Sequence, residues 1–407
     1  MTEIKISGTF KLLAFLRRKE AIIYAWDAEI MTAYIHELPD WPHFQWDEKH
    51  LAVKVAAVRY RQGRMLGALE RLGIKLREEA ILRTLTEEVV KSSEIEGEIL
   101  DREQVRSSLA RRLGIDVGAL KPADRDVEGV VDMILDATRD YRKPLTAERL
   151  FGWHAALFPT GYSGLHKIAV GKWRTEEAGA MRVVSGAIGR ERTHFEAPEA
   201  KRLDKEMAAF LEWVEDKAVE SMVDPVLRAA IAHLWFVTIH PFEDGNGRIG
   251  RAIIDMMLAR AEKSAQRFYS MSAQIRKERG KYYDYLEETQ KGDLDITDHL
   301  EWFLGCMERA FDGAEIILKD VLRKARFWER HSGEEFNVRQ RNILNRLMEG
   351  FEGKLTSSKW AKITKCSQDT AGRDIEDLIK RHILKKDAAG GRSTSYSLVE
   401  SEINDKQ

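Results

Sequence analysis

The chain has 407 residues, which is long enough for two or three domains with a sizeable core. Its 66 Lys and Arg residues nearly balance 67 Asp and Glu residues, so composition excludes a global affinity for polyanions and leaves only a local one. Cys306 and Cys366 are the only cysteines, and they show no pairing pattern that would indicate an oxidising compartment.

The N-terminal region, residues 1–88, is predicted to be helical. The apolar run 10–16 is too short and too closely flanked by charge to be a signal core. A short helix is expected over 22–36 and a longer one over 49–72, where apolar residues recur at helical spacing. We therefore expect a soluble, cytoplasmic protein with no membrane partner.

The next predicted helix includes 84–90 and ends in Ser92-Ser93-Glu94-Ile95-Glu96-Gly97. Taken alone, this stretch is an acidic helix terminus with a glycine stop. Ser92 and Glu96 are four residues apart and therefore share one face of the helix. Further helices are predicted over 101–113, 124–141 and 147–157, the last with Thr146 as its N-cap.

Two short extended runs, 180–184 and 192–195, flank a loop that contains two glycines. This pattern predicts a β-hairpin whose first strand includes Met181, Val183 and Val184. From these residues alone, an ordinary surface hairpin explains the pattern equally well. A helix is expected over 200–215.

The most informative stretch is HPFEDGNGRIGR, from His240 to Arg251. The apolar helix before it, 226–239, is too short to span a bilayer, and Pro241 is expected to end it. The residues from Asp244 to Gly247 are typical of a turn that lets its backbone approach a ligand closely. Apolar periodicity over 248–258 then predicts a new helix.

The chemistry of this stretch favours a phosphate-binding site. A helix that follows a Gly-Asn-Gly loop offers free amides and a positive dipole end to an anion. Arg248 and Arg251 oppose that dipole, which indicates a bound polyanion that supplies the missing negative charge. Asp244 suits Mg²⁺, and His240 has a pKa suited to proton removal near neutral pH. A plain helix-loop-helix corner is the alternative interpretation of the turn by itself.

The stretch fits every specified position of HxFx[DE]GNGRxxR, and so it resembles the Fic-domain protein adenylyltransferases (AMPylators). The resemblance covers 89–304 and implies a mainly α fold, a Fic-type helical core with a small β-hairpin flap. It implies ATP and Mg²⁺ as cofactors. As partner it implies a protein with an acceptor Ser, Thr or Tyr hydroxyl, this chain itself included. Family members that act as kinases replace Gly247 by lysine and lack Arg251, so these residues favour AMP transfer.

The resemblance also implies roles for single residues. His240 would be the base toward the target hydroxyl, Asp244 the Mg²⁺ ligand, and Phe242 the anchor of the motif in the core. Arg248 and Arg251 would bind the β- and γ-phosphates. The whole nucleotide-binding set is Gly245, Asn246, Gly247, Arg248, Ile249, Gly250 and Arg251, with Tyr282 and Tyr283 as an adenine contact or as core packing.

Ser92, Glu96 and Gly97 match the inhibitory pattern [ST]xxxE[GN] of the family. A Glu96 carboxylate that reached Arg251 would form a bidentate pair and pull this arginine off the γ-phosphate, which leaves the α-phosphate poorly aimed. The implied inhibition acts in cis or across a homodimer. The hairpin is implied to be the flap that docks the target by strand addition beside His240. Residues 171–174 resemble the family's Gly-x-aromatic-Arg segment.

A linking helix is expected in 305–335, followed by a unit of its own over 336–400. Helices over 338–348, 357–362 and 368–380 and a hairpin around Gly390-Gly391 resemble a winged helix-turn-helix. From 336 to 396 there are 13 Lys and Arg against 7 Asp and Glu, a balance of +6 that suits phosphate contacts. The third helix, however, carries four acids. DNA binding and a protein-docking or dimer role are both left open.

These patterns leave three functions. The leading one is an adenylyltransferase that Glu96 inhibits. In the second, the same Glu96 orients a water that removes AMP from a modified protein. In the third, the chain is a DNA-binding regulator whose Fic core senses nucleotide.

Overall fold

The computed structural model describes residues 34–117, 120–186, 190, 192–348, 351, 353–387 and 394–399. Among these residues, helices dominate and strands form only small antiparallel pairs, so the predicted mainly α class is confirmed. Most of the helix expected over 22–36 lies outside the described residues. At its expected end, the structure has the short 3-10 helix Ile35–Glu37. Within the described ranges, no helix is both long and apolar enough to cross a membrane.

Side-chain caps fix the starts of several helices in the first half of the chain. The helices are α2 (Glu48–Glu70), α3 (Ile74–Ile95), α4 (Arg102–Leu113), α5 (Arg125–Arg139) and α6 (Ala147–Leu157). Side-chain oxygens of Asp47, Asp101 and Thr146 accept from first-turn amides of α2, α4 and α6, which a helix start otherwise leaves free. The N-cap predicted at Thr146 is confirmed.

Two consecutive helices, α9 (Pro225–Ile239) and α10 (Asn246–Glu262), form the centre of the molecule. Every residue of α9 after Pro225 is buried, and so is α10 from Arg248 to Ala259. The surrounding helices in the second half are α7 (Leu203–Glu215), α8 (Lys217–Met222), α11 (Met271–Lys277), α12 (Arg279–Gln290) and α13 (Thr297–Arg330). Charged side chains are rarely buried without partners, so the buried Arg248 and Arg251 of α10 must have partners nearby.

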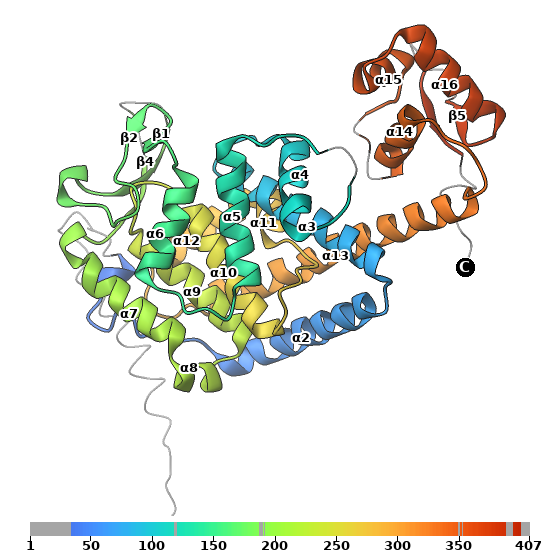
Figure 1. The fold of residues 1–407 in the computed structure, drawn as a ribbon. Helices are drawn as coiled ribbons and strands as arrows, with labels where there is room; N and C mark the ends of the chain where they lie inside the picture. The colour runs from blue at the N-terminus through green and yellow to red at the C-terminus, as the bar shows by residue number, and fades with distance from the viewer. Residues whose placement is uncertain are drawn as a thin grey trace, which may run out of the picture.

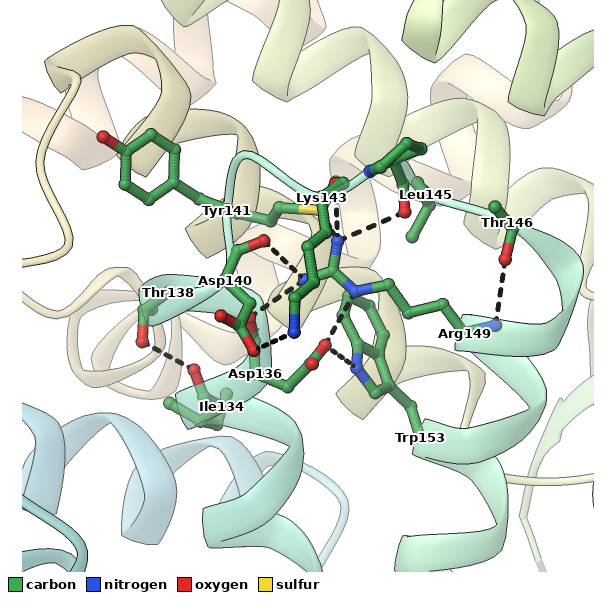
Figure 2. A network of polar contacts seen from close by, with 12 residues as sticks. Ile134, Asp136, Thr138, Asp140, Tyr141, Lys143, Leu145, Thr146, Arg149 and Trp153 are labelled. Atoms are coloured by element: carbon green, nitrogen blue, oxygen red, sulfur yellow. Dashed lines mark hydrogen bonds and ion pairs between the residues drawn. The ribbon is translucent and has the colours of Figure 1, made fainter.

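A polar network holds α6 against α5 (Figure 2). The Arg149 guanidinium donates to the Asp136 carboxylate at 2.7 Å and to the carbonyls of Asp136 and Asp140 at the end of α5. Trp153 Nε1 donates to the same carboxylate at 2.6 Å. These bonds satisfy carbonyls that a helix end leaves free. They hold α6 in place, and the Phe151 and His154 rings of this helix contact the ring of Phe242.

Two hairpins come from the segment between α6 and α7. β1 (Tyr162–Ser163) pairs with β2 (His166–Lys167), and β3 (Arg182–Ser185) pairs with β4 (Arg192–Glu196). The second hairpin is the predicted one: Val183 and Val184 lie in β3, and Met181 directly precedes it. The register shifts between Val183 and Val184, as at a β-bulge.

The C-terminal elements form a cluster with a core of its own. They are α14 (Val338–Met348), α15 (Ser357–Thr364), α16 (Gln368–Lys380), β5 (Leu384–Lys386) and β6 (Tyr396–Leu398). Figure 1 shows them at the far end of α13, apart from the other helices. β5 pairs with β6, and Leu355 bridges to Tyr396. The elements agree with the expected order, whereas the winged-helix assignment stays a prediction and the Gly390-Gly391 turn lies outside the described residues.

Candidate active site

His240 follows the last residue of α9 in a left-handed backbone conformation. The helix stops at Ile239, as Pro241 predicts, and His240 is left-handed with φ 51°. Its Nδ1 lies 3.2 Å from the Val237 carbonyl oxygen, which can only accept, so Nδ1 carries the proton and Nε2 keeps its lone pair. Burial lowers the pKa of His240 to about 4, and the nearby Arg174 charge acts in the same direction. The ring is therefore neutral near pH 7 and able to accept a proton.

Arg174 braces the loop that follows His240. Its backbone amide donates to the Pro241 carbonyl at 2.9 Å, and its Nε donates to the His240 carbonyl at 2.8 Å. The same guanidinium also donates to the carbonyl of Pro198, two residues beyond β4. Arg174 is buried, and burial lowers its pKa to about 10. The sequence marked 171–174 only as a family likeness, so this bracing role was not predicted.

Phe242 and Asn246 hold the motif loop in shape. The Phe242 ring is buried and stacks on the His154 ring, with centroids 4.2 Å apart, which agrees with the anchor that the resemblance implies. Asn246 Oδ1 accepts from the Phe242 amide at 3.0 Å, and its Nδ2 donates to the Phe242 carbonyl at 2.8 Å. The Asn246 side chain is thus used by the loop, and its backbone remains for a ligand.

The start of α10 leaves backbone donors free. The helix begins at Asn246, so the predicted start at Arg248 was two residues late, because Gly245 takes φ 82° and lets the helix begin inside the turn. The first intrahelical bond joins the Ile249 amide to the Gly245 carbonyl at 3.0 Å. The amides of Asn246, Gly247 and Arg248 therefore have no partner within the helix, an arrangement suited to a phosphate.

The other residues of the predicted nucleotide-binding set serve close packing. A Cβ on Gly247 would lie 2.1 Å from a Glu96 carboxylate oxygen. A Cβ on Gly250 would lie 2.9 Å from a methyl carbon of Val237, so Gly250 lets α10 approach α9. Ile249 is fully buried. Gly247 thus lies where α3 meets the motif, whereas Ile249 and Gly250 serve the core.

Both motif arginines are buried and engaged by residues at the end of α3. Arg251 Nη1 lies 2.8 Å from Glu96 Oε1, while Nε and Nη2 donate to the hydroxyl and carbonyl of Ser92 at 3.0 and 2.8 Å. The expected bidentate pair was therefore wrong: one Glu96 oxygen pairs with the guanidinium, and Ser92 occupies the remaining nitrogens. Arg248 Nη1 donates to Glu98 Oε2 at 2.5 Å, a contact that the sequence analysis missed. Gly97, which separates the two carboxylates, has φ 87°.

Asp244 lies at the outer side of the loop. One carboxylate oxygen accepts from the Gly245 amide at 2.5 Å, and the other accepts from the Ser163 hydroxyl in β1, a partner that was not predicted. The side chain is 43% exposed. In the part of the chain that the structure describes, no three His, Cys, Asp or Glu side chains form a metal-binding group. Mg²⁺ is commonly held by one or two carboxylates with phosphate and water oxygens, so a lone, oriented Asp244 fits that ion.

The two tyrosines of the predicted adenine contact differ in burial. Tyr282 is buried, its hydroxyl lies 3.1 Å from His233 Nε2, and burial raises its pKa, all of which suits core packing. Tyr283 is half-buried, and the Arg279 guanidinium carbon lies 5.2 Å from its ring centroid. An adenine contact thus stays a prediction, with Tyr283 as the more accessible ring.

Two family models match this chain. Residues 144–258 match the Fic/DOC family, and residues 34–115 match a domain of unknown function (DUF4172). The first range contains the motif from His240 to Arg251, and the second contains Ser92, Glu96 and Gly97. The chain therefore carries a Fic domain, preceded by a segment whose family has no assigned function.

Curated proteins are similar to this chain in sequence, and a solved structure is similar to it in fold. The protein adenylyltransferase Fic of Nematostella vectensis is 31% identical over 148 residues, 36% of this chain and 32% of that protein. The protein of the same name from Aedes aegypti is 37% identical over 106 residues, 26% and 19% of the two chains. The match thus spans a third or less of either relative. The crystal structure of a Fic family protein from Desulfovibrio desulfuricans G20 aligns with 86% of this chain and 95% of its own at 22% identity and a TM-score of 0.50, so the fold is shared.

Proposed function

We propose that this chain is a protein adenylyltransferase that transfers AMP from ATP to a Ser, Thr or Tyr hydroxyl of a protein. The observation that carries the proposal is the convergence at the start of α10. There, a neutral His240, an oriented Asp244, free amides and two buried arginines meet within one motif. The names of the curated relatives support the same activity.

The residues divide the reaction as follows. His240 Nε2 takes the proton of the acceptor hydroxyl, whose oxygen then bonds to the α-phosphorus of ATP while the bond to the pyrophosphate oxygen breaks. The free amides of Asn246 and Gly247 and the two guanidinium groups offset charge on the phosphates. Asp244 would hold Mg²⁺, which when bound neutralises phosphate charge.

Inhibition by Glu96 belongs to the same proposal. Its carboxylate pairs with Arg251, so the arginine is not available to a γ-phosphate. The pair forms within one chain, which supports inhibition in cis, and inhibition across a homodimer stays a prediction. Glu96→Gly is expected to raise AMP transfer because it frees Arg251.

The test uses ATP labelled at either the α- or the γ-phosphate, with Mg²⁺ and a mixture of acceptor proteins. Glu96→Gly protein should transfer the α-label and not the γ-label, and adding His240→Ala should abolish the transfer while ATP binding persists. His43→Ala, at an exposed histidine outside the motif, is the matched control. Transfer of the γ-label would indicate a kinase. Release of AMP from labelled proteins by the wild-type chain, which keeps Glu96, would indicate that the enzyme removes AMP by hydrolysis. Equal labelling by His240→Ala would contradict the role of the base.

The C-terminal unit fits a docking role, and DNA is the partner to test first. On α16, Asp374 is buried and accepts from Arg339 at 2.6 Å, and Asp377 accepts from Gln340 at 2.8 Å. Two of the acids that argued against DNA binding therefore face α14. Salt-dependent binding of duplex DNA to the full chain would support this partner, and binding that does not respond to salt would oppose it.

A further inference from the structure

The end of α3 places two carboxylates, not one, against the motif. Gly97 takes φ 87°, its amide donates to the Glu94 carbonyl at 3.2 Å, and the Glu98 amide donates to the Ser93 carbonyl at 3.0 Å. This is the Schellman arrangement, which reverses the chain after a helix. The reversal returns the Glu98 side chain toward α10 beside that of Glu96.

Each carboxylate takes one motif arginine. Glu98 Oε2 accepts from Arg248 Nη1 at 2.5 Å, and Glu96 Oε1 lies 2.8 Å from Arg251 Nη1. Arg248 is only 3% exposed, and its other carboxylate neighbour, Asp244, is 3.9 Å away. Glu98, through this short charge-assisted hydrogen bond, is therefore the main carboxylate partner of the buried Arg248 guanidinium.

The helix dipoles explain why these charges face one another. Carboxylates at the C-terminal end of α3 and arginines at the N-terminal end of α10 each oppose the dipole of their own helix. Placed opposite one another, they supply the counter-charge that each helix end lacks. Partial desolvation, together with the neighbouring Asp244 and Glu96 charges, raises the pKa of Glu98 although Arg248 lowers it, and the Glu98 side chain stays 46% exposed.

We propose that the Glu96 and Glu98 carboxylates together take the place of the terminal phosphates of the nucleotide. Glu98 pairs with Arg248 in the same way as Glu96 pairs with Arg251. The inference rests on the proposed function because it takes the arginines to be phosphate ligands. ATP must then displace two carboxylates. Glu96→Gly opens only half of the phosphate site, and full opening requires the loss of both charges.

The test compares full-length wild type, Glu96→Gly, Glu98→Gln and the double variant by calorimetric titration with ATP, pyrophosphate or AMP in the presence of Mg²⁺. Glu98→Gln should tighten ATP and pyrophosphate binding by about five- to tenfold, the scale of a charge pair with one buried partner. AMP affinity should not change, since AMP lacks the phosphates that meet Arg248. The double variant should bind pyrophosphate more tightly than either single variant.

Glu94→Gln is the matched control. Glu94 lies on the same helix end but pairs with Lys91 at 2.8 Å and with Arg276 at 3.6 Å, so its loss should leave all three affinities unchanged. Thermal unfolding of each variant verifies that it is folded. Unchanged or weaker pyrophosphate binding by folded Glu98→Gln would overturn the inference, and so would an equal gain for AMP.

The two proposals fail separately. Binding requires no transfer, so tighter pyrophosphate binding by Glu98→Gln without any AMP transfer would contradict only the proposed activity. AMP transfer by Glu96→Gly, together with unchanged ATP and pyrophosphate affinity of Glu98→Gln, would contradict only the role of Glu98.

Discussion

His240 keeps a backbone conformation that few residues other than glycine adopt, and its neighbours explain why. A left-handed φ of 51° raises the energy of such a residue by about 1–3 kcal/mol. Pro241 prevents continuation of the helix, and Arg174 donates to the carbonyls of both residues. The surrounding structure thus fixes a strained backbone at the residue that we propose as the base.

The pH dependence of AMP transfer should report the lowered pKa of His240. Because a general base must be unprotonated, kcat/KM of Glu96→Gly protein should stay constant as pH falls to about 6 and decrease only toward the pKa of about 4. The measurement is initial-rate kinetics across pH, with circular dichroism at each pH to verify folding. An acid limb near 6.5, the ordinary value for histidine, would contradict the assignment.

The helices α9, α10 and α3 position the site as a group. The α9–α10 pair is buried, and Gly250 removes the side chain that would hold the two helices apart. Further along α3, Glu88 accepts from the Ser270 hydroxyl at 2.7 Å and the Ser272 amide at 3.1 Å, next to and within the first turn of α11. These hydrogen bonds hold α3 against α11, so the carboxylates at the end of α3 are positioned by a helix that is itself held in place.

Gly250→Ala should destabilise the protein through the α9–α10 contact. The added Cβ would lie 2.9 Å from Val237 and 3.2 Å from His233, so the free energy of unfolding should fall by about 1–3 kcal/mol. Urea unfolding followed by circular dichroism gives this difference.

Gly63→Ala is the matched control for that substitution. Gly63 is exposed within α2 and has nothing within 4 Å of an added Cβ. Alanine there should raise the free energy of unfolding by about 0.5–1 kcal/mol, because it improves helix propensity. A stabilised Gly250→Ala, or equal effects of the two changes, would refute the close-packing argument.

At the scale of the whole molecule, the two largest hydrophobic clusters among the described residues are joined by α13. The larger one includes residues from Ile35 to Ala314, and the C-terminal one includes Phe327, Ile343, Trp360 and Leu398. Contacts between the C-terminal helices and the body include the exposed pair Arg346–Glu103 at 3.2 Å. Exposed ion pairs contribute little to stability, so we expect the two cores to respond separately to mutation.

Trp360→Ala tests that separation. Trp360 is fully buried in the C-terminal core, so its loss should destabilise this unit by about 3–5 kcal/mol. ATP affinity should stay within about twofold of wild type, because Trp360 belongs to the C-terminal cluster, which Figure 1 shows apart from α10. Urea unfolding and nucleotide titration on the same protein measure both effects. A large loss of ATP affinity would show that the units are coupled.

Local signals made much of this protein predictable from its sequence. Proline, glycine and capping residues act within a few positions of themselves, and so the end of α9, the start of α6 and the predicted hairpin followed from their own residues. The motif likewise carries its histidine, its aspartate and both arginines within one turn and the start of the next helix. The mainly α fold and the Fic domain followed from the resemblance of this motif to a known family.

Tertiary structure decided which partners those residues have. Glu98 and Arg248 are 150 positions apart, Ser163 and Asp244 are 81, and Arg174 and His240 are 66, so no local pattern joins them. The single-oxygen pair of Glu96 also depended on the contacts of Arg251 with the distant Ser92. The sequence determined which chemical groups the motif carries, whereas packing of α3 against α10 determined that carboxylates hold both arginines, because that pairing arises only when distant helices meet.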